Sequence, residues 1–256
     1  VSPMSNWTVL KFGGTSVSKV ERWETIADVL EQRLADGQQP FVVCSALSGV
    51  SNLLEAIVER APDGEFEDLL DEIDMRHRRL ADRLRVDVDE VLGEQLEELR
   101  RLAVGVSLTG EVSPRLHARI LAHGELMSTR LGAAFLASEY GLDVAWRDAR
   151  RMLRADSEPH IGPRRHFLSA TCHFDPDDAL QDELGEADAD VVLTQGFIAS
   201  DDAGNTVLLG RGGSDTSAAY FAAKLGAERL EVWTDVPGMF TANPRDIPSA
   251  RLLRQL

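Results

Sequence analysis

Short, continuous apolar runs alternate with longer stretches of helical periodicity along the chain. A continuous run is typical of a strand covered on both faces. Strands are therefore predicted at residues 9–12, 41–44, 144–146, 191–194 and 230–234. Helical spacing predicts helices over 18–35, after Ser45, over 115–140 and over 214–225. The turn residues at 201–204, followed by the apolar run 206–209, predict a β-hairpin.

This alternation of strand and helix predicts a three-layer α/β/α sandwich with a mostly parallel central sheet. Residues 63–104 differ, because they are rich in charged residues and leucine and contain few strand formers. They predict a solvated helical hairpin inserted into the α/β domain. His77 stands between Arg76 and Arg78, and we expect it to be exposed and not to be a ligand.

Composition narrows the possible partners. The chain has 256 residues, of which 43% are hydrophobic, and a net charge of −16. This charge argues against nucleic acid or an anionic membrane as partner. Cys44 and Cys172 are the only cysteines, too few for a disulfide framework, so a reducing cytoplasm is predicted. No apolar run approaches the roughly 20 residues of a membrane span.

The first candidate site is a glycine turn between a strand and a helix. Lys11 and Phe12 end the first predicted strand, and Gly13 and Gly14 follow it before the first helix. Glycines allow close approach of the backbone, and free amides at a helix start favour an anion such as phosphate. A tight turn with a surface lysine is an equally good interpretation of this segment alone.

A second glycine cluster lies between the predicted hairpin and the helix over 214–225. Arg211 can make paired hydrogen bonds to a carboxylate or phosphate, and the amides of Gly212 and Gly213 would point at the same anion. Asp215 can cap the helix or orient a lysine. Two glycine turns, each with a cation at a junction that leads into a helix, are stronger evidence than either one.

Two further segments carry candidate chemistry. Gly124, inside the long helix, costs about 1 kcal/mol against alanine, so it needs close packing or an approaching ligand as its reason. Its neighbour Glu125 lies among apolar residues, though an ordinary helix glutamate is an equal alternative. At the end of the last strand, Asp235 and Arg245 could meet a nucleotide, but a plain Pro-Gly turn is favoured on that segment alone.

Several common motifs are absent from the sequence. There is no Walker-type Gly-x-x-x-x-Gly-Lys, Gly-x-Gly-x-x-Gly, His-Glu-x-x-His or Gly-x-Ser-x-Gly. By motif, the chain is not a P-loop NTPase, a Rossmann dehydrogenase, a zincin or a serine hydrolase.

Taken together, the segments resemble the aspartate kinases of the amino acid kinase family. The motifs follow the family order: Lys-Phe-Gly-Gly-Thr-Ser at 11–16, Ser-Ala at 45–46 with Gly-Val-Ser-Asn at 49–52, His-Gly-Glu-Leu-Met-Ser at 123–128, Gln-Gly-Phe-Ile at 195–198, Gly-Arg-Gly-Gly-Ser-Asp at 210–215, Trp-Thr-Asp-Val-Pro-Gly at 233–238 and Asn-Pro-Arg at 243–245. The glycine turns alone would also admit glutamate 5-kinase, acetylglutamate kinase or uridylate kinase. The segments around Glu125 and Arg211 favour aspartate.

The resemblance implies ATP and Mg²⁺ as cofactors and L-aspartate as substrate. It implies that Lys11, with Asp215 positioning it, is catalytic. The implied aspartate-binding residues are Ser45, Ser51, Glu125, Phe197, Arg211, Gly212, Gly213 and Ser214. The implied nucleotide-binding residues are Lys11, Phe12, Gly13, Gly14, Thr234, Asp235, Phe240 and Arg245, with no protein metal ligand. Ser51 and Phe240 stand where threonine and tyrosine are usual.

The aspartate β-carboxylate is ionised at neutral pH, since its reference pKa is about 3.9. The nucleophile therefore needs no general base, and catalysis reduces to alignment and charge stabilisation. The resemblance also implies an amino-acid-binding lobe over 1–188, with the insertion at 63–104, and a nucleotide-binding lobe over 189–256. The chain starts at Val1 and ends before the family's Phe-Gly-x-Lys segment, so we expect it to be the incomplete catalytic domain of a longer, homo-oligomeric polypeptide. Another small-acid kinase of the same fold, or a non-catalytic amino-acid or nucleotide sensor, is the alternative.

Overall fold

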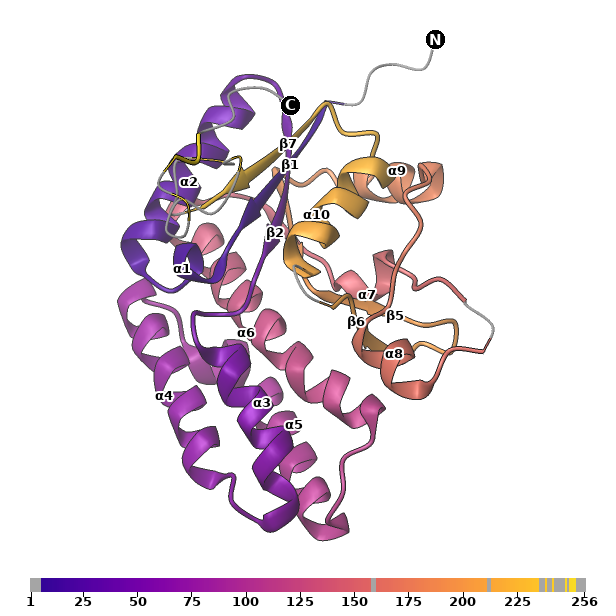
Figure 1. Cartoon of the computed structure of the whole chain (residues 1–256). Coiled ribbons are helices and arrows are strands. Elements are labelled where there is room, and N and C mark those ends of the chain that lie inside the picture. The colour runs from indigo at the N-terminus through magenta and orange to yellow at the C-terminus, as the bar shows by residue number, and fades with distance from the viewer. Residues whose placement is uncertain are drawn as a thin grey trace.

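A five-stranded, wholly parallel sheet forms the centre of the molecule (Figure 1). The structure is a computed structural model that describes residues 6–157, 160–210, 213–234, 238, 241, 247 and 249–251. The strand order is β3-β4-β2-β1-β7, and all five strands were predicted from their apolar runs. Their bounds are Trp7–Phe12 (β1), Gln39–Cys44 (β2), Val144–Trp146 (β3), Val191–Gln195 (β4) and Arg229–Trp233 (β7).

Helices cover both faces of this sheet, as the predicted sandwich requires. Helices α2 and α6 pack together on one face, whereas α9 and α10 lie on the other (Figure 1). The helices are α1 (Gly14–Val17), α2 (Val20–Ala35), α3 (Val50–Arg60), α4 (Glu67–Leu84), α5 (Val88–Thr109), α6 (Pro114–Tyr140), α7 (Ala149–Met152), α8 (Pro163–Leu168), α9 (Asp178–Gly185) and α10 (Gly213–Lys224), with a short 3₁₀ turn at Ala61–Asp63.

The predicted β-hairpin is also present. Strands β5 (Ile198–Ser200) and β6 (Thr206–Leu208) pair antiparallel and form a separate two-stranded sheet. Asp201 closes the turn because its carboxylate accepts hydrogen bonds from the backbone amides of Ala203 and Asn205. This hairpin connects the end of β4 to the glycine cluster that precedes α10.

The charged segment forms a helical hairpin of α4 and α5, which packs against α3 and α6 (Figure 1). The prediction that His77 is exposed is wrong, because its side chain is fully buried. Ile73, His77 and Ala81 recur every fourth residue and form part of the buried stripe of α4. The neighbouring arginines point away from that stripe, so the flanking charges say nothing about the position between them.

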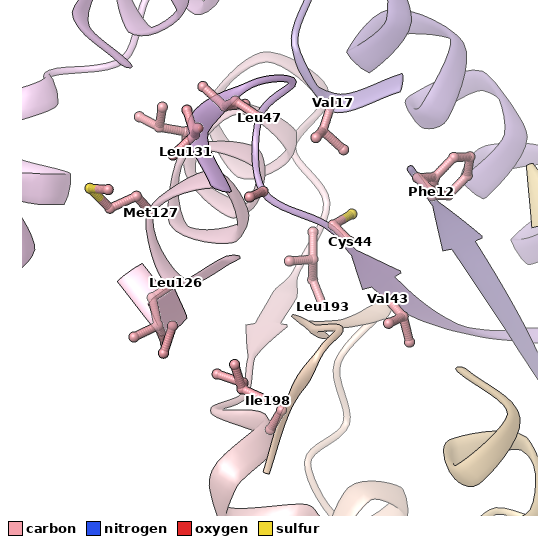
Figure 2. Close-up of a cluster of buried hydrophobic side chains, with 14 of the residues drawn as sticks. Phe12, Val17, Val43, Cys44, Leu47, Leu126, Met127, Leu131, Leu193 and Ile198 are labelled. Atoms are coloured by element: carbon pink, nitrogen blue, oxygen red, sulfur yellow. The ribbon is translucent and has the colours of Figure 1, made fainter. Parts of the chain in front are cut away.

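A hydrophobic core joins the sheet to the helix that carries the Glu125 segment. Figure 2 shows Cys44 and Leu193 of the sheet on the same side as Leu126, Met127 and Leu131 of α6, whereas Val43 points to the opposite side of the sheet. All six side chains are buried. This packing holds α6 against the carboxyl ends of β2 and β4, where the candidate site lies.

Strands from both predicted lobes contribute to the one sheet, since β1, β2 and β3 precede residue 189 whereas β4 and β7 follow it. The lobe boundary stays a prediction. Within the part of the chain that the structure describes, no helix has the length and apolar character needed to span a membrane.

Candidate active site

A cavity of about 530 Å³ lies at the carboxyl ends of β1, β2 and β4. Ligands bind at this edge of open parallel sheets, because the loops that follow the strands converge there. Nine of the residues predicted from the sequence line the cavity together: Lys11, Gly14, Ser45, Ser51, Glu125, Phe197, Gly213, Ser214 and Asp215. The sequence places these residues in five separate motifs, and the fold brings them to one place.

Lys11 and Asp215 form an ion pair across the cavity. The Lys11 Nζ atom lies 2.7 Å from Asp215 Oδ1. Lys11 stands near the end of β1, where pairing with both β2 and β7 fixes its backbone, and Asp215 stands in the first turn of α10. The lysine side chain is 12% exposed and the aspartate 60%, so the ammonium is held in place while still facing the cavity.

The first glycine turn packs directly on the loop after β2. A Cβ atom added at Gly14 would lie 2.9 Å from the carbonyl oxygen of Ala46, which no side chain tolerates. The loop itself is anchored because the Ser128 hydroxyl donates a hydrogen bond of 2.7 Å to the Ser45 carbonyl. The two loops therefore form one rigid rim of the cavity.

Glu125 is a buried carboxyl group that lines the cavity. Its side chain is 4% exposed, its Oε1 accepts a 3.3 Å hydrogen bond from the amide of Ala46, and its Oε2 has no hydrogen-bond partner in the described residues. Burial raises the pKa of Glu125 to about 8, since a carboxylate is poorly solvated there. Such a group has the chemistry to receive a ligand cation.

Close packing explains the neighbouring glycine of α6. A Cβ atom at Gly124 would lie 2.8 Å from the Cβ of Ala46 and 3.2 Å from Leu54 Cδ1. Of the two reasons predicted for a glycine inside this helix, the structure gives packing. The absence of a side chain brings the helix close enough for Glu125 to reach the Ala46 amide.

Phe197 adopts an unusual backbone conformation beside the second glycine cluster. Its φ angle is +69°, which is uncommon for a residue other than glycine. Its amide donates a 2.8 Å hydrogen bond to the Ser217 hydroxyl, and its carbonyl accepts one from the Leu209 amide. A Cβ atom at Gly213 would lie 2.5 Å from Phe197 Cδ2, so α10 begins directly against this ring.

The remaining predicted residues lie elsewhere or outside the described residues. Phe12 is buried, and its ring stacks on Trp233 with 6.1 Å between centroids, so only its backbone is available to a nucleotide. Thr234 is exposed just after β7, and Gly13 caps α1. The positions outside the described residues are Arg211, Gly212, Asp235, Phe240 and Arg245.

The cavity also contains residues that were not singled out from the sequence, among them Glu55 and Leu121. Glu55 lies four residues after Ser51 on α3, and Leu121 lies four before Glu125 on α6. Residues four apart share a helix face, so this spacing was a usable signal. Glu55 is paired with His117 of α6, at 2.8 Å between Oε2 and Nε2.

Residues 6–256 match the sequence profile of the Amino acid kinase family. Two glycine turns lie at the cavity, at the carboxyl edge of the parallel sheet, and the Lys11–Asp215 pair lies beside them. This arrangement is consistent with that match. The chain belongs to the amino acid kinase family.

Within this family the chain is similar to aspartokinases. It is 36% identical over 255 residues to lysine-sensitive aspartokinase 3 of Escherichia coli (strain K12), which covers 99% of this chain and 54% of that protein. It is 30% identical to bifunctional aspartokinase/homoserine dehydrogenase 1, chloroplastic, of Arabidopsis thaliana, over 98% of this chain and 27% of that protein.

A solved structure agrees with these sequence matches. The crystal structure of E. coli aspartokinase III in complex with aspartate and ADP superimposes with a TM-score of 0.80 at 35% identity, over 96% of this chain and 53% of that one. The chain thus spans about half the length of the aspartokinase relatives named here, and less of the bifunctional one.

Proposed function

We propose that this chain is the catalytic part of an aspartate kinase, which transfers the γ-phosphoryl group of ATP to the β-carboxylate of L-aspartate. This reaction is the entry step of lysine, threonine and methionine synthesis. The observation that carries the proposal is the single cavity in which the Lys11–Asp215 pair faces Glu125, Ser45 and Ser214. The similarity to aspartokinase III, whose crystal structure contains aspartate and ADP, supports it.

The aspartate part of the proposal rests on Glu125. An amino acid brings an ammonium group, and a buried carboxylate with one free oxygen is a fitting partner. The hydroxyls of Ser45 and Ser214 line the same cavity and offer hydrogen bonds to carboxylate oxygens. Arg211, which the resemblance implies as an aspartate-binding residue, lies outside the described residues.

The phosphoryl part of the proposal rests on Lys11. The transferred group carries its charge on peripheral oxygens, so a fixed ammonium nearby stabilises the transition state without forming a bond. Asp215 holds that ammonium in place at 2.7 Å. The attacking carboxylate is already ionised, so no residue has to remove a proton from it. The product is an acyl phosphate, β-aspartyl phosphate.

Mg²⁺ fits this cavity as an ion that arrives with the nucleotide. Among the described residues, no three histidine, cysteine, aspartate or glutamate side chains come together as metal ligands. Of the cavity carboxyl groups, Asp215 and Glu55 are engaged with Lys11 and His117, and Glu125 is assigned above to the ligand ammonium. Phosphate oxygens and water would therefore supply most ligands, and the ion would neutralise phosphate charge. The nucleotide lobe over 189–256 and the homo-oligomer stay predictions from the resemblance, and the cytoplasmic compartment stays a prediction from the cysteine content.

The test is trapping of the acyl phosphate with hydroxylamine in the presence of ATP, Mg²⁺ and L-aspartate. We expect aspartyl hydroxamate to accumulate in proportion to enzyme. Lys11→Ala should lower kcat by about 10²–10³-fold, the loss typical of one preorganised charge donor, with little change in aspartate binding. Lys19→Ala, an exposed lysine at the start of α2, is the matched control and should behave like the parent.

Acceptor exchange separates the alternatives. Product with glutamate, N-acetylglutamate or UMP but not with aspartate would assign another kinase of the same family. Tight binding of ATP and aspartate by calorimetry, without turnover even in the full-length polypeptide, would assign a sensor. A Lys11→Ala protein with the parent's rate would remove Lys11 from the mechanism.

A further inference from the structure

A second cavity, with a different character, lies beside β3. Its volume is about 250 Å³, and it shares no lining residue with the candidate active site. Three of its lining residues are arginines from different elements: Arg130 from α6, Arg147 just after β3 and Arg151 from α7. The rest of the lining is Trp146, Asp148, Met152 and Glu183.

Two of these guanidinium groups keep a buried N–H without an acceptor. The Arg130 guanidinium carbon lies 4.2 Å above the centre of the Trp146 ring. The Nε atoms of Arg130 and Arg147 are buried without a hydrogen-bond acceptor. None of the three arginines forms an ion pair within the described part of the chain. Buried donors without acceptors cost free energy, so an acceptor from outside the chain would be stabilised here.

The nearby carboxylates do not cancel this charge. Asp148 is occupied by Arg150, with 2.6 Å between its Oδ2 and Nη2. Glu183, an exposed residue of α9, contributes to the lining without an ion pair among the described residues. Burial lowers the pKa of Arg130, whereas the charges of Glu94 and Asp148 raise it. The lining holds three arginines against two carboxylates, one of which is already paired with Arg150, so the cavity keeps an excess of positive charge.

We propose that the cavity bounded by Arg130, Arg147 and Arg151 is a binding site for a small phosphate-bearing anion, distinct from the nucleotide and aspartate site. A guanidinium group donates paired hydrogen bonds to phosphate oxygens. A tetrahedral phosphate has enough acceptor oxygens for donors that approach from three elements. The aromatic face of Trp146 is already covered by Arg130, so the site selects for charge and not for a flat apolar group.

Trp146 provides a direct reporter for this site. Its indole N–H donates a 3.0 Å hydrogen bond to the Thr129 hydroxyl, which in turn donates to the Glu125 carbonyl at 2.8 Å. An anion that draws Arg130 toward itself changes the field over the indole ring. Fluorescence of Trp146 should therefore change on binding, whether or not the candidate active site is occupied.

The experiment is a tryptophan fluorescence titration of the full chain with inorganic phosphate and, in a second arm, with glycerol phosphate, at constant ionic strength set by chloride. We expect saturable binding with a Kd of the order of 1 mM or tighter. Arg130→Gln and Arg147→Gln should each weaken it about tenfold or more, the effect of losing one charged hydrogen-bond donor. Trp146→Phe should abolish the signal, and calorimetry should still detect the binding.

Three controls locate the binding. Lys11→Ala should keep it, because phosphate held in the candidate active site would depend on Lys11. Arg22→Gln, an exposed arginine on α2, should keep it as the charge-matched control. Arg151→Gln changes an exposed side chain and tests the site even where the variants of the half-buried Arg130 and Arg147 fold poorly.

The outcomes separate clearly. Stronger binding in the glycerol phosphate arm would assign a phosphate ester, and equal binding would assign the phosphate group alone. The proposal is overturned by a lack of saturable binding, by undiminished binding in the arginine variants, or by loss in Lys11→Ala alone. Equally tight binding of succinate would overturn the choice of phosphate.

Discussion

At the scale of single residues, the pKa of Glu125 links ligand binding to protons. Burial raises this pKa to about 8, so in the unliganded protein the carboxyl group is mostly protonated at neutral pH. An ammonium group beside it favours the ionised form. If L-aspartate is the ligand, its binding below pH 8 must release a proton from Glu125.

The prediction is that aspartate binding weakens as the pH falls below about 8, by up to tenfold per pH unit. Glu125→Gln should bind aspartate more weakly at pH 8 and lose this pH dependence. Calorimetry in buffers of different ionisation enthalpy measures the released proton directly. Glu59→Gln, an exposed glutamate on α3, is the control and should keep the parent's profile. A pH-independent parent would show that Glu125 is ionised before the ligand binds.

At the scale of secondary-structure elements, the contact between α2 and α6 depends on one glycine. A Cβ atom at Gly132 would lie 2.5 Å from Trp23 Cζ2 and closer still to Cη2. Trp23 cannot give way easily, because its ring is fully buried and its N–H donates a 2.9 Å hydrogen bond to the Val17 carbonyl. A side chain here must push the two helices apart.

Gly132→Ala should therefore destabilise the fold by about 1–3 kcal/mol or more, the cost of overpacking a core. Gly105→Ala on α5 is the matched control, because an added Cβ there meets nothing within 4 Å. That control should stabilise the fold by about 0.5–1 kcal/mol, since alanine favours the helix more than glycine does. Urea denaturation of the three proteins measures both effects. Equal stability of parent and Gly132→Ala would mean that α2 moves freely against α6.

The elements of this fold were predictable because their signals are local. Each central strand is a continuous apolar run, and the long helix α6 ends at a glycine, Gly141. Helices α7, α8 and α9 carry weaker signals and were not predicted. The burial of His77 was predicted wrongly because its two adjacent arginines were given more weight than the apolar positions that recur every fourth residue along α4. The positive φ of Phe197 and the stacking of Arg130 on Trp146 could not be predicted, because both depend on contacts between segments far apart in the sequence.

The candidate site was predictable to a similar extent and for a similar reason. Lys11 and Asp215 could be identified because each stands in or beside a glycine turn that is visible in the sequence. Glu55 and Leu121 do not, since they are ordinary helix residues until the facing helix is known. A search for residues four positions from each predicted contact would have found both.

At the scale of the whole molecule, the buried side chains of His77 and Glu125 make the free energy of unfolding depend on pH in opposite directions. Burial lowers the pKa of His77 from 6.5 to about 4. The stability that the neutral, buried side chain contributes is therefore complete above pH 6.5 and is lost as the pH falls toward 4. Burial raises the pKa of Glu125 from 4.5 to about 8, so the stability of its protonated form is complete below pH 4.5 and is lost as the pH rises toward 8. The two windows overlap between pH 4.5 and 6.5.

Variants at the two positions should therefore diverge from the parent in opposite directions within this overlap. The stability of His77→Leu relative to the parent should rise as the pH falls from 6.5, because leucine has no proton to bind in the unfolded chain. That of Glu125→Gln should rise as the pH increases from 4.5. Each difference should change by at most about 1.4 kcal/mol per pH unit, the value for one proton. Urea denaturation of all three proteins across pH 4.5–8 measures these slopes. Every other titrating group is common to parent and variant, so each curve of variant stability minus parent stability against pH reports on one side chain. If the two curves ran parallel, one of the two side chains would have to be solvated in the folded protein.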